Sequence, residues 1–144
     1  MMGIDILNAL KTLHRVGYCH QDLKLENICF KDGQYRLIDF GCSSKILDEK
    51  DLKNARGNLM FASIKQFTYR IRPSDDIESL LYVMAYCIDS FKLPWSFMSV
   101  GATLQEYIDL RIKSAHTFFD YFVQEMPEPL GKAFTYIRSL SKRT

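Results

Sequence analysis

Apolar residues recur at helical spacing near the start of the chain. Between about Ile4 and Val16 they return every three or four positions, and Gly17 then follows as a helix stop. The positions in this stripe are Ile6, Leu7, Leu10 and Leu13. The pattern predicts an amphipathic helix that leads directly into a polar loop.

A denser apolar stretch runs from Asp75 to about Ile88. A helix that is apolar nearly all round belongs at the centre of a core. Asp75 followed by Glu78 has the spacing of a capping box, so we expect the helix to begin there. Its apolar residues are Ile77, Leu80, Leu81, Val83, Met84, Ala85, Cys87 and Ile88.

Two further helices are predicted after residue 100. Thr103 with Glu106 repeats the capping-box pattern and opens the first, and a stripe after the Met126–Pro129 break marks the second. The stripe consists of Leu130, Ala133, Phe134, Ile137 and Leu140. Aromatic residues at 118–122 also have helical spacing, so we assign them to the core rather than to a platform that stacks nucleic-acid bases.

Two short apolar runs predict a β-hairpin. Ile28–Phe30 and Tyr35–Ile38 flank Lys31-Asp32-Gly33-Gln34, which is typical of a short hairpin whose turn depends on the glycine. The hairpin is expected to return Asp39 to the side where Asn27 lies. Residues 42–62, which follow, are polar and charged in their middle.

Bulk composition excludes several classes of protein. The chain has 144 residues, of which 47% are apolar, and this suits one globular domain. A net charge of +2 gives no support for nucleic-acid binding or attachment to a membrane surface. No apolar run approaches the roughly 18 residues of a membrane span, and the first residues lack the features of a signal peptide. We expect an intracellular protein of the cytoplasm or nucleus.

The four cysteines show no paired spacing, so reduced and mostly buried thiols are expected. A metal site built from His14, Cys19 and His20 has no evident fourth ligand, and we do not predict one.

Candidate chemistry is concentrated between His20 and Gly41. Phosphoryl transfer from a nucleotide needs a group that orients the attacking hydroxyl, a cation on the phosphoryl group, and oxygen ligands for Mg²⁺. In order, Asp22, Lys24 and then Asn27 with Asp39 supply these groups. The structural alternative is a loop and hairpin whose carboxylates only cap backbone groups.

These stretches resemble the catalytic loop and the metal-binding triplet of eukaryotic protein kinases, here residues 20–27 and Asp39-Phe40-Gly41. Later elements are similar to the casein kinase I group, including its vaccinia-related members. Ser63-Ile64 stands where most protein kinases have Ala-Pro-Glu. Pro73–Leu80 and Leu93-Pro94-Trp95 match elements of the same group.

The resemblance implies a fold that is mainly α with a short β-hairpin, the large C-terminal lobe of a protein kinase. Residues 1–144 would form this partial domain, with an activation segment at 42–63, a core helix at 75–88 and further helices to 144. Nothing in the chain resembles the glycine-rich loop, the strand lysine or its glutamate partner, which grip the nucleotide. We therefore expect the N-terminal lobe to be absent from this chain, as in a fragment or a truncated product.

The resemblance also implies roles for the site residues. Asp22 would orient a protein hydroxyl and Lys24 would stabilise the phosphoryl group. Asn27 and Asp39 would bind Mg²⁺ and, through it, ATP.

Two other residues are implied to be structural. His20 would hold the loop without proton chemistry, and Asp76 would accept hydrogen bonds from the loop backbone.

Two positions depart from the family pattern. Gln21 replaces an arginine that pairs with a phosphate on the activation segment, so switching of that kind is not expected. Asn58 replaces a threonine that ties the catalytic aspartate to the lysine, which puts full activity in doubt.

Two functions therefore remain open. The first is a serine/threonine protein kinase similar to casein kinase I, using ATP and Mg²⁺. Its protein substrates would be acidic or already phosphorylated if the basic residues at 45–56 contact them. The second is a non-catalytic kinase-like module, a pseudokinase that binds a protein partner. A nucleic-acid-binding helical domain has only scattered lysines and aromatic residues in its favour.

Overall fold

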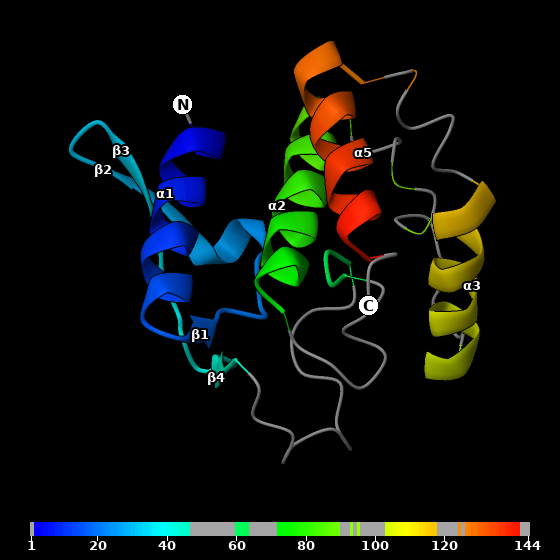
Figure 1. Cartoon of the computed structure of the whole chain (residues 1–144), viewed down its shortest axis with the longest axis horizontal. Coiled ribbons are helices and arrows are strands. Elements are labelled where there is room, and N and C mark those ends of the chain that lie inside the picture. Colours follow the sequence, from blue (N-terminus) through cyan, green and yellow to red (C-terminus); the bar gives the residue numbers. More distant parts are fainter. Residues whose placement is uncertain are drawn as a thin grey trace. The chain divides into compact units, whose positions relative to one another are not determined.

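The computed structural model describes residues 2–46, 60–63, 72–89, 93, 95, 103–117, 124 and 126–141 (Figure 1). The chain divides into two compact units, Met1–Met84 and Ala85–Thr144. Most of the expected activation segment, with Asn58 and three of its basic residues, lies outside the described residues, as does the aromatic cluster at 118–122.

The first unit begins with helix α1 (Met2–Arg15), which confirms the predicted amphipathic helix. Ile6 and Leu10 are fully buried, whereas Leu7 is 44% exposed and lies on the edge of the apolar face. The helix ends where predicted. Gly17 has φ +92°, and its N–H donates to the carbonyl of His14 at 3.0 Å. Glycine suits this left-handed conformation because it has no Cβ.

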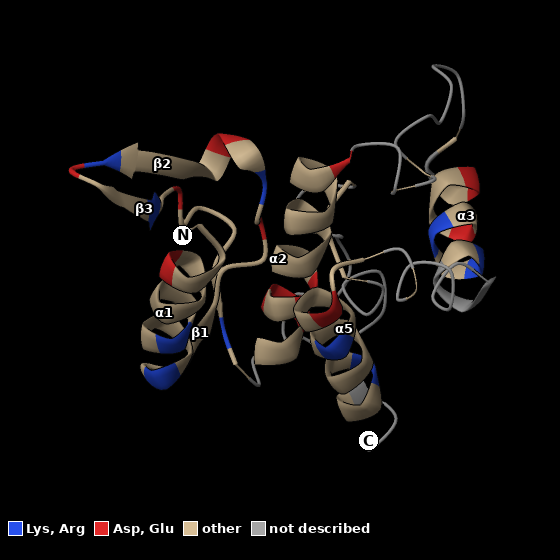
Figure 2. Cartoon of the chain, turned by 90° about the horizontal axis from the view of Figure 1, so that it is seen from above, with Lys and Arg blue, Asp and Glu red and all other residues tan. Residues whose placement is uncertain are grey.

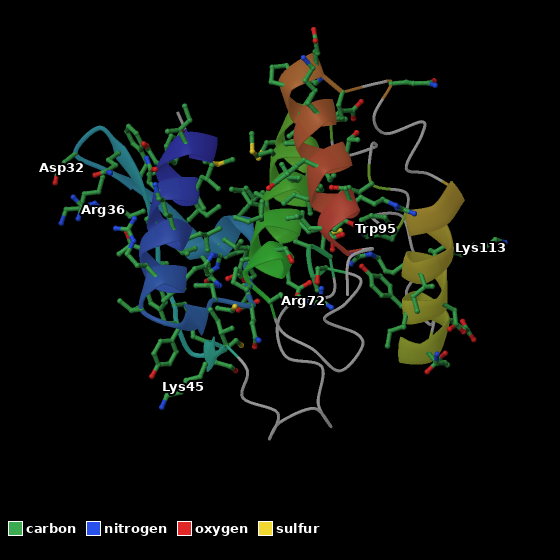
Figure 3. All side chains as sticks on the ribbon, viewed as in Figure 1. Asp32, Arg36, Lys45, Arg72, Trp95 and Lys113 are labelled. Carbon is green, nitrogen blue, oxygen red and sulfur yellow. The ribbon has the colours of Figure 1, made fainter. Side chains whose placement is uncertain are left out.

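The predicted hairpin is also present, as β2 (Ile28–Lys31) and β3 (Gln34–Leu37). Asp32 and Gly33 both have positive φ, as a type I′ turn requires, and Figure 3 shows Asp32 at the tip. The hairpin lies beside α1 in Figure 1, where the N–H of Tyr35 donates to Asp5 Oδ2 at 3.1 Å. This contact fixes the hairpin against the helix that precedes the loop.

A second pair of strands was not predicted. β1 (Tyr18–Cys19) and β4 (Ser44–Lys45) pair antiparallel, with Cys19 opposite Ser44. Strands of two residues carry no periodic pattern, so the sequence gives no signal for them. The pair joins the chain just before the loop at residue 20 to the chain just after Gly41.

Helix α2 (Pro73–Ile88) begins two residues earlier than predicted. Proline is favoured at the first helical position because the N–H that it lacks would have no partner there. Asp75 is therefore not the cap. It lies at the third helical position, and its Oδ2 accepts the N–H of Arg72 at 2.8 Å. At the C-terminal end of α2, Cys87 and Ile88 are exposed, so the prediction that they lie in the core was wrong.

The apolar core of the first unit connects these elements to the loop. Its buried members are Ile6, Leu10, Leu23, Leu37 and Leu80. Leu23 is 1% exposed and lies between Asp22 and Lys24 in the sequence, so its burial anchors the loop between two candidate site residues. Burying one leucine contributes about 2 kcal/mol.

The second unit contains the end of α2 together with α3 (Leu104–Thr117) and α5 (Glu128–Ser141). Thr103 caps α3, since its Oγ1 accepts the N–H of Glu106 at 3.1 Å. In Figure 3 Trp95 points toward α3, where the guanidinium of buried Arg111 lies 4.1 Å from its ring centre. Leu93 is buried as well, while Pro94 lies outside the described residues.

The distribution of charge, the hydropathy of the helices and the state of the cysteines can be compared with what the composition predicts. Figure 2 shows basic and acidic residues interspersed on the described elements of each unit. None of the described helices has the length and apolar character needed to span a membrane. The cysteines are free thiols, but only Cys19 is buried, so the expectation of mostly buried thiols was wrong.

Candidate active site

Asp76, in the first turn of α2, holds the start of the loop 20–27. Its Oδ2 accepts the N–H of His20 at 2.7 Å, and its Oδ1 accepts the N–H of Gln21 at 2.9 Å. The carboxylate is 1% exposed, so these bonds form away from water. They accompany a left-handed conformation at Gln21, φ +69°. The structural role expected for Asp76 is confirmed.

His20 uses both ring nitrogens within the fold. Nδ1 accepts the N–H of Asp22 at 3.1 Å, which leaves Nε2 to donate to the carbonyl of Ile38 at 3.0 Å. Its ring also meets that of Phe40 edge-on, with centroids 5.2 Å apart. His20 therefore connects the loop to the residues before Gly41, which confirms its predicted structural role.

Asp22 and Asn27 are held together directly. The Nδ2 of Asn27 donates to the carbonyl oxygen of Asp22 at 2.8 Å and to its Oδ2 at 3.1 Å. Both residues are buried, at 7% and 4% exposure. The ammonium of Lys24 lies 3.8 Å from Asp22 Oδ2, and its side chain is 34% exposed. A carboxylate, an amide and a cation thus meet within one short loop.

The hairpin positions the backbone that leads into Asp39. Ile28 pairs with Leu37, and the N–H of Ile38 donates to the carbonyl of Asn27 at 2.9 Å. Asp39, the next residue, is exposed and has φ +57°. Its Oδ1 accepts the N–H of Gly41 at 3.1 Å, which fixes its orientation within the triplet.

The four predicted site residues therefore differ in how they are placed. Direct side-chain contacts bring Asp22, Lys24 and Asn27 together, and backbone pairing brings Asp39 beside them. Their catalytic and binding roles remain predictions.

Ser63 and Asp75 form a contact that the sequence did not indicate. The hydroxyl of Ser63 donates to Asp75 Oδ1 at 2.9 Å, and both residues are buried. Burial raises the pKa of Asp75, against the opposing effect of its bonds from Arg72 and Ser63. The serine was noted for its resemblance to a family motif, but no pattern in the sequence connects positions 12 residues apart in this way.

The structure groups possible metal ligands differently from the set of His14, Cys19 and His20 that the sequence suggested. His14, Cys19 and Asp76 have donor atoms within 4.8 Å of one another, whereas both nitrogens of His20 are engaged elsewhere. Hydrogen bonds account for this cluster, since His14 Nε2 lies 2.8 Å from Asp76 Oδ2. Burial, with the nearby carboxylates, raises the pKa of Cys19 to about 12.

The donor set of the site suits Mg²⁺ instead. With Nδ2 directed at Asp22, Asn27 has its amide oxygen left for a cation, and Asp39 offers a carboxylate at an exposed position. Mg²⁺ prefers such oxygen ligands and is bound in proteins by one or two carboxylates with substrate phosphates. The oxygen atoms of Asn27 and Asp39 therefore fit Mg²⁺.

Comparison with known proteins identifies the family of the chain. The family model "Protein kinase domain" matches residues 2–94. The probable casein kinase I homolog of Encephalitozoon cuniculi is 35% identical over 124 residues, covering 78% of this chain and 37% of that protein. The B1 kinases of vaccinia virus and monkeypox virus are each 28% identical over 160 residues. Those matches cover 98% of this chain and 52% or 51% of the viral proteins.

The chain thus spans about half the length, or less, of the curated relatives it matches. The family model nevertheless covers well over half of the chain, including every residue of the site described above. On this basis the chain belongs to the protein kinase family, and its described residues form part of a protein kinase fold.

Proposed function

We propose that the chain provides the catalytic-loop part of a serine/threonine protein kinase similar to casein kinase I. The observation that carries this proposal is the contact of Asp22 with Asn27 and Lys24 in one loop held by Asp76. The reaction transfers the γ-phosphoryl group of ATP to a protein hydroxyl.

Each residue has a distinct part in this reaction. Asp22 accepts the hydrogen of the attacking hydroxyl and orients its oxygen toward the γ-phosphorus. The bond from that oxygen to phosphorus forms as the bond to the β-phosphate oxygen breaks, and ADP leaves. Lys24 offsets negative charge on the phosphoryl oxygens, and its partly exposed side chain places the ammonium 3.8 Å from Asp22. Asn27 and Asp39 would hold Mg²⁺, which would neutralise charge on the phosphate groups.

Substrate preference is proposed from the basic residues after the triplet. Lys45 is exposed on β4, and Figure 3 shows its side chain directed away from the ribbon. Together with the basic residues at 50, 53 and 56, it would favour acidic or already phosphorylated proteins. We place the reaction in the cytoplasm or nucleus.

A second candidate is a kinase-like module that binds a protein partner without catalysis. Gln21 and Asn58, which replace family residues, favour it.

The two candidates differ in their response to substitution of Asp39. Asp32 is a matched control, since it is also an exposed aspartate with positive φ, but lies at the hairpin tip. Asparagine tolerates this conformation at both sites. With casein and labelled ATP, Asp39→Asn should slow transfer by about a hundredfold or more, while Asp32→Asn stays within about twofold. Equal rates in the two variants would reject the kinase proposal.

A further inference from the structure

Two neighbouring carboxylates in the first turn of α2 hold two different segments of the chain. Asp76 accepts hydrogen bonds from the backbone of His20 and Gln21, as described above. Asp75 accepts the hydroxyl of Ser63 and the N–H of Arg72. One turn of helix therefore connects the loop that carries Asp22 to the end of the segment expected to lie over the substrate.

The contact between Ser63 and Asp75 is well sheltered. Ser63 is 0% exposed and Asp75 is 5% exposed, and the preceding residues Phe61 and Ala62 are buried too. A hydrogen bond is electrostatically stronger away from water than in it. This bond can therefore define one position for residues 61–63.

A short series of contacts connects Ser63 to Asp22, the proposed partner of the substrate hydroxyl. Ser63 connects to Asp75, whose neighbour Asp76 holds the N–H of Gln21, and Asp22 is the next residue. A substrate hydroxyl must come within hydrogen-bond distance of Asp22, so residues flanking it must pass over whatever is anchored beside the loop. Ser63, at the end of residues 60–63, is anchored to α2 by its bond to Asp75.

We propose that Ser63 is a positioning residue for the protein substrate. Its hydrogen bond to Asp75 fixes residues 60–63 relative to Asp22 and so sets affinity for the protein substrate, while leaving affinity for ATP unchanged. This inference rests on the proposed kinase function, and it adds a role for a residue outside the catalytic loop.

The test compares Ser63→Ala with Ser79→Ala. Ser79 is 2% exposed and lies on the same helix as Asp75, so its variant controls for loss of a buried hydroxyl. With casein as the probe, Ser63→Ala should raise the KM for casein about tenfold, whereas kcat and the KM for ATP stay within about twofold. Ser63→Thr, which keeps the hydroxyl, should restore the KM for casein. An unchanged KM for casein, an equal rise in both KM values, or the same effect from Ser79→Ala would overturn the proposal.

Hydrogen exchange provides a readout that needs no activity. Ser63→Ala should speed exchange at residues 60–63 and leave His20 and Gln21 protected, since Asp76 still accepts their N–H groups. Unaltered exchange at 60–63 would overturn the positioning role. Absence of phosphate transfer by the unsubstituted protein would instead count against the kinase function, and the exchange pattern would then decide the role of Ser63 separately.

Discussion

At the residue scale, the position of Asp22 depends on the amide of Asn27. This amide donates twice to Asp22, once to the backbone and once to the carboxylate. An aspartate at position 27 would have the same shape but no donors, and it would place a second carboxylate beside Oδ2 of Asp22. Both changes act in a buried setting, where a lost partner and a like charge are costly.

Asn27→Asp is therefore expected to lower the free energy of unfolding by about 2 to 4 kcal/mol at neutral pH. Urea denaturation measures this change. Asn8→Asp on the exposed face of α1 is the matched control and should change the free energy of unfolding by less than about 0.5 kcal/mol. A loss at position 27 no larger than that at position 8 would mean that the two hydrogen bonds do not hold Asp22.

Cys19 and Cys29 provide a second comparison between residues. The pKa of Cys19 is raised from 9.0 to about 12, chiefly by burial, so its thiolate fraction near neutral pH is roughly a thousandfold below that of an unperturbed thiol. Cys29 is exposed on β2. Iodoacetamide should modify Cys29 in the native protein and leave Cys19 unmodified until urea is added. Peptide mass spectrometry distinguishes the two, and similar native rates would contradict the burial of Cys19.

The same shift has a consequence for stability at alkaline pH. The folded state retains the proton of Cys19 to a higher pH than the unfolded state. The contribution of the protonated thiol to the free energy of unfolding is therefore complete below about pH 9. That contribution is lost as the pH rises toward about 12.

At the scale of elements, Asp75 at the start of α2 accepts the hydrogen bond that positions Ser63, and its burial disfavours its ionised form. Asp75 is buried, and burial raises its pKa above the ordinary 3.8. The folded state therefore binds this proton more tightly than the unfolded state. The contribution of Asp75 to stability is fully present below pH 3.8 and is lost as the pH rises through the raised pKa.

Asp75→Asn removes this titration. The free energy of unfolding of the variant, relative to the unsubstituted protein, should therefore improve between about pH 4 and about pH 7. Urea denaturation at both pH values measures the change, with Asp109→Asn on the exposed face of α3 as control. A relative stability that is constant with pH, or that worsens toward pH 7, would contradict the raised pKa.

How far the sequence predicts these elements depends on the range of the interactions that define them. The β2–β3 hairpin follows from Asp32-Gly33, and the end of α1 follows from Gly17, because each is determined by adjacent residues. The β1–β4 pair joins Tyr18 to Lys45 and Cys19 to Ser44, which are 27 and 25 positions apart, and only tertiary packing defines it. The start of α2 was misplaced because Asp75 suits either the cap or the third position, and the contribution of Pro73 was overlooked.

For the candidate site the same distinction holds. Asp22, Lys24 and Asn27 lie within six residues, so their spacing alone predicts that they meet. The bond between Ser63 and Asp75 and the contact of His14 with Asp76 join residues 12 and 62 apart. Neither has a local signal.

At the scale of the whole molecule, all four predicted site residues belong to one compact unit, Met1–Met84. The arrangement of Asp22, Lys24 and Asn27 is therefore defined within that unit, together with its hold on α2 through Asp76. Within this unit, Lys24 is assigned to the phosphoryl group and Asn27 and Asp39 to Mg²⁺, separately from the assignment of Asp22 to the substrate hydroxyl.

This distribution predicts that binding and transfer can be separated. Magnesium–ATP should bind the purified chain more tightly than ATP in the presence of EDTA, by about tenfold, because the proposed ligands Asn27 and Asp39 act through the metal. Isothermal titration calorimetry measures both affinities. Equal affinities would remove the basis for a magnesium site.

Asp22→Asn then distinguishes catalysis from binding. Asp22 is assigned to the substrate hydroxyl rather than to the metal, so the variant should keep magnesium–ATP affinity within about threefold and lose transfer to casein by about a hundredfold or more. Thermal unfolding of the variant is the control, since Asn27 also donates to this carboxylate. A folded variant that transfers phosphate at the unsubstituted rate would show that Asp22 is not the group that orients the hydroxyl. Binding of magnesium–ATP with no transfer by the unsubstituted protein would favour the non-catalytic module, in which the same loop serves only to hold a nucleotide.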